Sequence, residues 1–147
     1  MTLAMAALLA AALPNAVVLN PVVNMYSRPS EDADVVSQAI YGVNVGIVES
    51  REGWLRIRTP DEYTGWAPAA ALRQGPPYAA EGEVVEVASL FAHIYREANV
   101  TRHAPLVTAP FETRLEVARQ VNDRWLEVRL PGGGAGFVQQ GDVERNP

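Results

Sequence analysis

The sequence predicts an all-β protein made of two small barrels in tandem, preceded by a short apolar segment. Apolar and polar residues alternate over short stretches that are separated by Gly, Pro and polar turns, which is the pattern of half-buried strands. One hairpin pattern also occurs twice. The 147 residues are 48% hydrophobic and 20% charged, a composition typical of globular proteins.

The repeated hairpin is the strongest signal in the chain. Its first copy runs from Gly53 to Trp66, and its second copy from Arg124 to Val138. Four landmark residues recur 71 positions later, and the pairs are Trp54 and Trp125, Pro60 and Pro131, Gly65 and Gly136, and Trp66 and Phe137. A constant spacing at four positions predicts a duplicated domain. Because a domain of this size has little core, we expect the aromatic residues to be core or a half-exposed platform.

The repeat sets the predicted domain boundaries. An apolar N-terminal segment covers residues 1–16, the first barrel 17–74, a linker 75–83 and the second barrel 84–147. The linker contains a Pro-Pro pair, which makes it semi-rigid.

The elements are expected in the same order in both units. In the first unit they are strands near 17–19, 22–26, 35–41 and 43–49, then the hairpin, and a short turn at 68–72. In the second unit they are strands near 84–87, 90–95, 106–109 and 115–120, then the second hairpin. The hairpins agree better between the copies than the long loops 27–34 and 96–105 do, as expected if the hairpins build the core.

The N-terminal segment has two interpretations. Its apolar run at residues 3–13 is too short to span a bilayer. It matches the hydrophobic region of a secretory signal, although no basic residue precedes it. The alternative is a short helix that packs on the first barrel and ends at Pro14. A signal would place the protein in the cell envelope or outside the cell.

Composition argues against several function classes. The net charge of −5, without a basic block, makes nucleic acid an unexpected partner. The absence of Cys excludes disulfides, thiolate zinc sites and a cysteine nucleophile within this chain. His93 and His103 lack metal-site spacing, and Gly132 to Gly134 form a turn rather than a phosphate loop. We therefore expect no metal, no cofactor and no catalytic set.

Four segments of the first unit carry a resemblance to a known family. Val22 to Ser30, Gly42-Val43, Gly53 to Arg58 and Tyr63 to Ala67 resemble the start, middle and finish of a bacterial SH3 domain. The second unit is similar but degenerate. A tandem pair of this kind resembles the N-terminal, non-catalytic half of NlpC/P60 cysteine peptidases, which cleave murein peptides.

The resemblance implies a binding role rather than catalysis here. In that family a catalytic part with an Asp-Cys-Ser-Gly motif follows the second barrel, and this chain has no Cys. The chain is then either a fragment of a longer peptidase or a separate binding module. The implied partners are a murein peptide with a free N-terminal amine and a C-terminal or separate catalytic domain. Neither nucleic acid nor membrane is expected as a partner.

The resemblance also implies the site residues. In related proteins the long loop and the hairpin of the first barrel help to receive the amine of the terminal Ala. The matching positions are Glu31 and Tyr63, and Asp32 is interchangeable with Glu31 because the loop alignment is not fixed. An ammonium group favours a carboxylate and a hydrogen-bond acceptor. Tyr26 beside the loop is a further candidate, as a groove aromatic or as a residue at the core edge.

A second function class stays open. The same aromatic residues would suit a protein–protein scaffold that binds an extended or Pro-rich segment.

Overall fold

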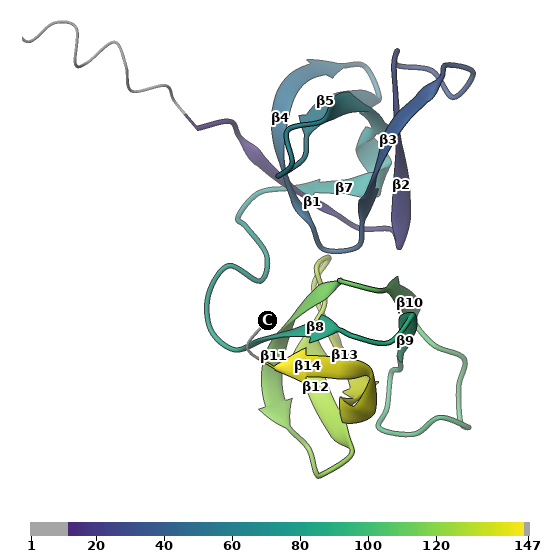
Figure 1. Cartoon of the computed structure of the whole chain (residues 1–147), viewed down its shortest axis with the longest axis vertical. Coiled ribbons are helices and arrows are strands. Elements are labelled where there is room, and N and C mark those ends of the chain that lie inside the picture. Colours follow the sequence, from purple (N-terminus) through teal and green to yellow (C-terminus); the bar gives the residue numbers. More distant parts are fainter. Residues whose placement is uncertain (1–11, 146–147) are drawn as a thin grey trace, which may run out of the picture.

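The computed structural model describes residues 12–145, which form two all-β units stacked along the long axis of the molecule (Figure 1). The linker runs along one side and joins the last strand of the first unit to the first strand of the second. The predictions for residues 1–11 lie outside the described part of the chain. The all-β fold class is confirmed.

The first unit is one seven-stranded antiparallel sheet that curls into a barrel. Its elements are β1 (Asn15–Val18), β2 (Val22–Tyr26), β3 (Val35–Ile40), β4 (Asn44–Arg51), β5 (Trp54–Arg58), β6 (Thr64–Pro68), the 3₁₀ turn η1 (Ala69–Ala71) and β7 (Leu72–Gln74). The strand order is β3-β2-β6-β5-β4-β1-β7. The Trp54-to-Trp66 stretch is therefore the central β5–β6 hairpin, as predicted.

The second unit has the same sequence of elements. They are β8 (Val84–Val87), β9 (Phe91–Ile94), β10 (Val107–Pro110), β11 (Arg114–Gln120), β12 (Trp125–Arg129), β13 (Ala135–Gln139), η2 (Gln140–Asp142) and β14 (Val143–Arg145). A five-stranded sheet has the order β13-β12-β11-β8-β14, and β9 pairs with β10 separately. The β9–β10 ribbon joins the larger sheet through a bridge between Tyr95 and Phe137.

The two hairpins pair in matching register. Trp54 lies opposite Pro68 in β5–β6, and Trp125 lies opposite Gln139 in β12–β13. Both units also shift register in the strand before the hairpin, between Ile47 and Glu49 and after Val117. The β12–β13 hairpin therefore reproduces the backbone pairing of the β5–β6 hairpin.

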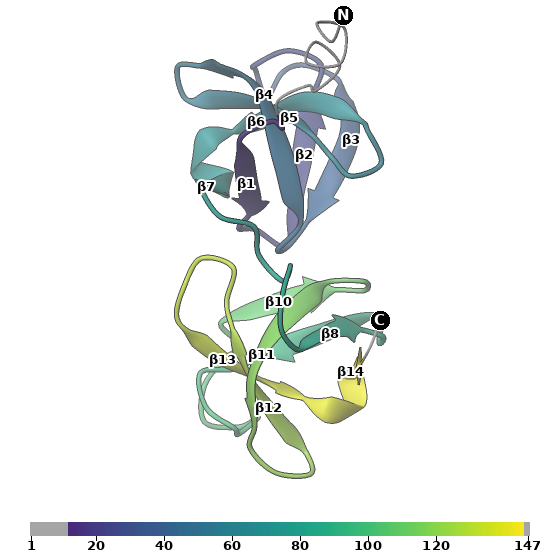
Figure 2. The same cartoon turned by 90° about the vertical axis from the view of Figure 1, so that its left-hand side faces the viewer.

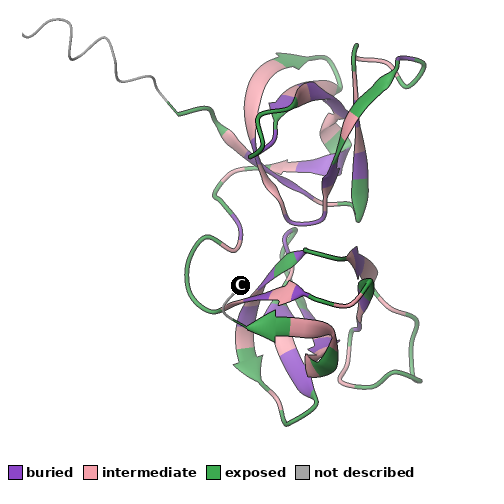
Figure 3. Ribbon diagram, in the orientation of Figure 1, coloured by how far each residue is buried: buried purple, intermediate pink, exposed green. Residues whose placement is uncertain are grey.

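Each unit has its own hydrophobic core, and the hairpins supply it from one face only. Leu55 and Ile57 of β5 are almost fully buried, as are Leu126 and Val128 of β12. Figure 3 shows how buried and exposed positions alternate along the strands. Trp54 and Trp66 belong to neither core cluster. They share the opposite face of the hairpin, because side chains alternate between the two faces of a strand.

The first strand starts earlier than predicted. β1 begins at Asn15, inside the segment assigned to residues 1–16, and lies between β4 and β7 rather than at an edge. The carbonyl of Pro14 accepts a hydrogen bond from Ile47 N–H at 2.8 Å. The side chain of Asn15 donates to Gly75 O at 3.0 Å. These bonds join the start of β1 to β4 and to the residue that follows β7.

The main anchor of the linker is Tyr78, which is 4% exposed. Asn44 of the first unit donates to Tyr78 O at 2.7 Å and accepts from Tyr78 N–H at 2.8 Å. On the other side, the Tyr78 hydroxyl donates to Arg129 O and accepts from Glu116 N–H at 3.1 Å. Burial raises the pKa of Tyr78 well above its ordinary value, so the hydroxyl stays protonated and able to donate.

The two units lie end to end with the linker beside their junction (Figure 2), and side chains join them directly there. Tyr41, at the end of β3, is 5% exposed and packs with the core cluster of the second unit. Arg73 donates from Nε to Pro131 O at 2.7 Å. The turn at Gly42 has a φ of +78°, and a Cβ there would lie 3.2 Å from the Tyr78 ring. Glycine at this position lets the turn approach the linker.

No helix among residues 12–145 combines the length and the apolar character that crossing a membrane requires.

Tyr78→Phe should lower the free energy of unfolding by about 1–3 kcal/mol, because it leaves two partly buried backbone groups, Arg129 O and Glu116 N–H, without this partner. Chemical denaturation measures this loss. Tyr63→Phe is the matched control, since Tyr63 is 58% exposed and its hydroxyl makes no hydrogen bond to the described residues. We expect the control to change stability by less than about 0.5 kcal/mol. Equal effects of the two substitutions would show that Tyr78 does not hold the units together.

Candidate functional site

An aromatic cluster covers the outer face of the first hairpin. Tyr26 packs edge-to-face on Trp54, with ring centroids 5.9 Å apart and planes at 86°. The backbone of Tyr26 pairs with that of Trp66, which is 6% exposed. The guanidinium of Arg51 lies 5.2 Å from the Trp66 ring centroid. The cluster is held by aromatic and cation–π contacts outside the barrel core.

The predicted acidic loop follows directly from Tyr26. It is closed by a hydrogen bond from Ser27 N–H to Asp34 O at 2.9 Å, and its tip turns at Glu31 and Asp32. Asp32 N–H donates to the Ser30 hydroxyl at 3.1 Å. Both carboxylates are exposed and enter no ion pair with another described residue. Both carboxylates are therefore open to solvent.

Tyr63 lies in the connection between β5 and β6. The carbonyl of Tyr63 accepts from Thr59 N–H at 2.9 Å and from the Thr59 hydroxyl at 3.3 Å, which closes the turn. Glu62 beside it has a φ of +70°, a strained conformation for a residue with a side chain. The Tyr63 ring is left largely exposed.

The structure connects some of these predicted residues to one another and leaves others apart. Tyr26 connects the acidic loop to the tryptophans, both through the chain and through ring packing. Tyr63 has no hydrogen bond to the acidic loop within residues 12–145. Sequence reasoning missed Arg51, which also pairs with Glu49 at 3.3 Å. Its place three residues before Trp54, at the end of β4, is a signal that could have pointed to it.

The second unit carries a comparable cluster. Tyr95 packs edge-to-face on Trp125, with centroids 5.8 Å apart. Arg124 lies over the Trp125 ring at 5.9 Å from its centroid. The loop beside it contains Glu97, which pairs with Arg102 and with His103. The hydrogen bond to Arg102 lowers the pKa of Glu97 most, and His103 lowers it further.

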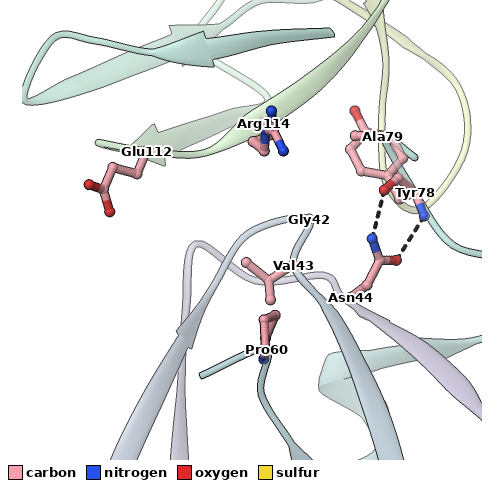
Figure 4. Close-up of a pocket in the computed structure, with 8 residues that line it drawn as sticks. All are labelled: Gly42, Val43, Asn44, Pro60, Tyr78, Ala79, Glu112 and Arg114. Atoms are coloured by element: carbon pink, nitrogen blue, oxygen red, sulfur yellow. Dashed lines mark hydrogen bonds between the residues drawn. The ribbon is translucent and has the colours of Figure 1, made fainter. Parts of the chain in front are cut away.

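A cavity of about 210 Å³ lies between the two units (Figure 4). Its walls come from Gly42, Val43, Asn44 and Pro60 of the first unit, from Tyr78 and Ala79 of the linker, and from Glu112 and Arg114 of the second. Burial raises the pKa of Tyr41 at this junction to about 12. Asn44 and Tyr78 use their polar atoms on each other, so this cavity is part of the joint between the units.

Within the described residues, no group of three or more His, Asp and Glu side chains is placed to bind a metal ion.

Comparison with known proteins identifies the first unit. Residues 25–72 match the family model of the bacterial dipeptidyl-peptidase SH3 domain. Dipeptidyl-peptidase 6 of Lysinibacillus sphaericus is 38% identical over 53 residues, which are 35% of this chain and 20% of that protein. The resemblance of the first unit to bacterial SH3 domains is confirmed.

Solved structures extend the likeness to the fold of both units. An NlpC/P60 family protein from Bacillus cereus gives a TM-score of 0.72 at 16% identity, over 89% of this chain and 56% of that chain. NlpC2 from Trichomonas vaginalis gives a TM-score of only 0.36 at 14% identity, over 89% of this chain and 47% of that one. The chain thus spans a fifth of the peptidase relative and little more than half of the Bacillus cereus protein.

Leu55→Ala and Trp54→Ala should differ in their cost in stability, because the two side chains lie on opposite faces of the hairpin. Leu55 is 2% exposed in the core, and its truncation should cost about 2–5 kcal/mol of stability. Trp54 is half-buried outside the core, so we expect its truncation to cost less than about 2 kcal/mol despite the larger side chain. Denaturation midpoints measure both. A larger loss from Trp54→Ala would contradict the assignment of the tryptophans to a surface cluster.

Proposed function

Starting from the bacterial SH3 domain at residues 25–72, we propose that this chain is a non-catalytic binding and positioning module for murein peptide. It would serve a catalytic domain of the NlpC/P60 type, attached to it or separate from it. The relatives that support this are a dipeptidyl-peptidase, matched through the first unit, and an NlpC/P60 family protein that shares the fold. Such a role belongs in the cell envelope or outside the cell.

One observation carries the proposal in the structure. Two exposed carboxylates at the loop tip, Glu31 and Asp32, directly follow the aromatic cluster around Tyr26 in the chain. A peptide amine needs an acceptor that is not already neutralised, and an adjacent apolar surface excludes water from one side of it. The exposed Tyr63 supplies a further hydroxyl on the hairpin connection. The first unit is thus the better candidate for amine recognition.

The second unit would act as a positioning element. The matching order of elements and hairpin register support its origin as a second copy of the same domain. Its contacts through Tyr41, Arg73 and Tyr78 give it a defined place beside the first unit. A binding module attached through such a joint would hold its ligand at a fixed position relative to a neighbouring domain.

A scaffold function is the alternative, and one observation favours it. β3 lies at an edge of the sheet, and its residues Val35 and Val36 are 51% and 47% exposed. An extended segment of another protein could add a strand there. Capture of a protein partner, together with no affinity for purified cell wall, would support the scaffold instead.

Titration of a murein tripeptide whose N-terminal Ala carries a free amine tests the main proposal. Glu31→Gln and Asp32→Asn should weaken binding, the dominant carboxylate by about tenfold or more, because a charge-assisted hydrogen bond is lost. Tyr63→Phe should weaken binding by a smaller factor, since its hydroxyl is neutral. Isothermal titration calorimetry measures the affinities.

Two controls sharpen this titration. Glu52→Gln removes another exposed carboxylate from the same unit and should leave the affinity unchanged. The affinity of an N-acetylated tripeptide for wild type should be no higher than the affinity of the free tripeptide for the weakest-binding loop variant. Unchanged affinity in Glu31→Gln, Asp32→Asn and Tyr63→Phe alike would reject these site residues.

A further inference from the structure

The second unit contains a separate cavity of about 260 Å³ on its outer side, away from the joint between the units. It lies between the loop that joins β9 to β10 and the start of the β12 strand. Its lining residues are Ala98, Asn99, Val100, Thr101, Arg124 and Trp125. The loop wall carries the Asn99 amide beside Val100, and the strand wall carries the Arg124 guanidinium beside the Trp125 ring.

The loop side of the cavity is preorganised by Asn99. Its Oδ1 accepts hydrogen bonds from Thr101 N–H at 2.8 Å, from the Thr101 hydroxyl at 2.9 Å and from Arg102 N–H at 3.1 Å. The acceptor of this side chain is thus fully used. Its Nδ2 amide, which takes no part in these bonds, remains a donor for a ligand.

Arg124 is the charged group of the cavity. Its Nε donates to Gln139 Oε1 at 3.0 Å, and its guanidinium lies over the Trp125 ring. No carboxylate of residues 12–145 lies within ion-pair distance of Arg124, and its two terminal nitrogens donate to none of these residues. The partner that holds it in place is a neutral amide, so its positive charge is not cancelled.

The first unit shows the opposite arrangement. Arg51 also lies over a tryptophan, Trp66, but it pairs with Glu49 at 3.3 Å. The nearest acid in the loop of the second unit, Glu97, is already paired with Arg102 at 2.9 Å. The charge available to a ligand is thus negative at the loop of the first unit and positive in the cavity of the second.

From this charge and shape we propose that the second unit binds the free C-terminal carboxylate of a peptide whose last residue is small and apolar. The carboxylate would accept hydrogen bonds from the terminal nitrogens of Arg124 and from the Asn99 amide. The side chain of the last residue would lie against Trp125 and Val100, which is 39% exposed. The volume suits one terminal residue rather than a folded partner.

The rest of the peptide has a path along the same face. Tyr95 lies next to Trp125, and His93 and Phe91 continue the row at centroid spacings of 6.0 and 5.2 Å. Phe91 at the far end is 48% exposed. This site rests on residues of the second unit alone, so it does not depend on the amine site proposed for the first.

Titration with N-acetyl-alanyl-alanine, followed by two-dimensional NMR, tests the inference on the whole chain. The indole N–H signal of Trp125 should shift on binding, while those of Trp54 and Trp66 should not; a Trp125→Phe variant assigns the signal. The same peptide with its C-terminus amidated should bind at least about tenfold more weakly, because the carboxylate is removed. Shifts confined to the first unit would overturn the inference.

Arg124→Gln should weaken binding of the acetylated dipeptide at least about tenfold and remove the preference over the amidated peptide. Arg51→Gln is the matched control, because it removes the cation over Trp66 in the first unit and should leave the affinity unchanged. Arg124→Lys should retain part of the affinity, since the charge stays while the fork of donors is lost. Equal affinities of wild type and Arg124→Gln in a folded protein, or no binding by wild type at millimolar peptide, would overturn the inference.

Discussion

The arrangement of the two units depends on the burial of Tyr78 between them. Its backbone is bound on both sides by the Asn44 side chain, and its hydroxyl reaches two backbone groups of the second unit. A buried polar network of this kind is stabilising only when every member has its partner, so it favours one geometry over others. The linker acts as a fixed joint because this residue is satisfied by both units at once.

The hairpin serves two purposes through its two faces. Leu55 and Ile57 face the core of the first unit, while Trp54 and Trp66 lie on the outer side with Tyr26. Tyr26 packs on Trp54, and the Arg51 guanidinium lies over Trp66, which is 6% exposed without belonging to the core. This leaves an aromatic surface beside each long loop, and it relates folding and the proposed binding through the same strand pair.

The loops give the two similar scaffolds different charges. In the first unit the loop presents Glu31 and Asp32, and the arginine over its tryptophan is neutralised by Glu49. In the second unit Glu97 is neutralised, and Arg124 keeps its charge. The two proposed sites on this chain would then recognise groups of opposite sign. This is a more specific arrangement than two copies of one site would provide.

The sequence alone predicted the succession of strands along the chain, the hairpin pattern that occurs twice and the type of the first domain, because these depend on local alternation and on turn residues that are read along the chain. It also placed the loop acids and Tyr63 on the surface. It could not show that Trp54 lies outside the core, because a half-buried aromatic and a core aromatic have the same spacing in a strand. Only the tertiary structure decided the inclusion of Asn15 in the barrel, the burial of Tyr78 and the lack of an ion-pair partner for Arg124 among residues 12–145. Each of these depends on contacts between residues far apart in the chain, and sequence periodicity does not reveal such contacts.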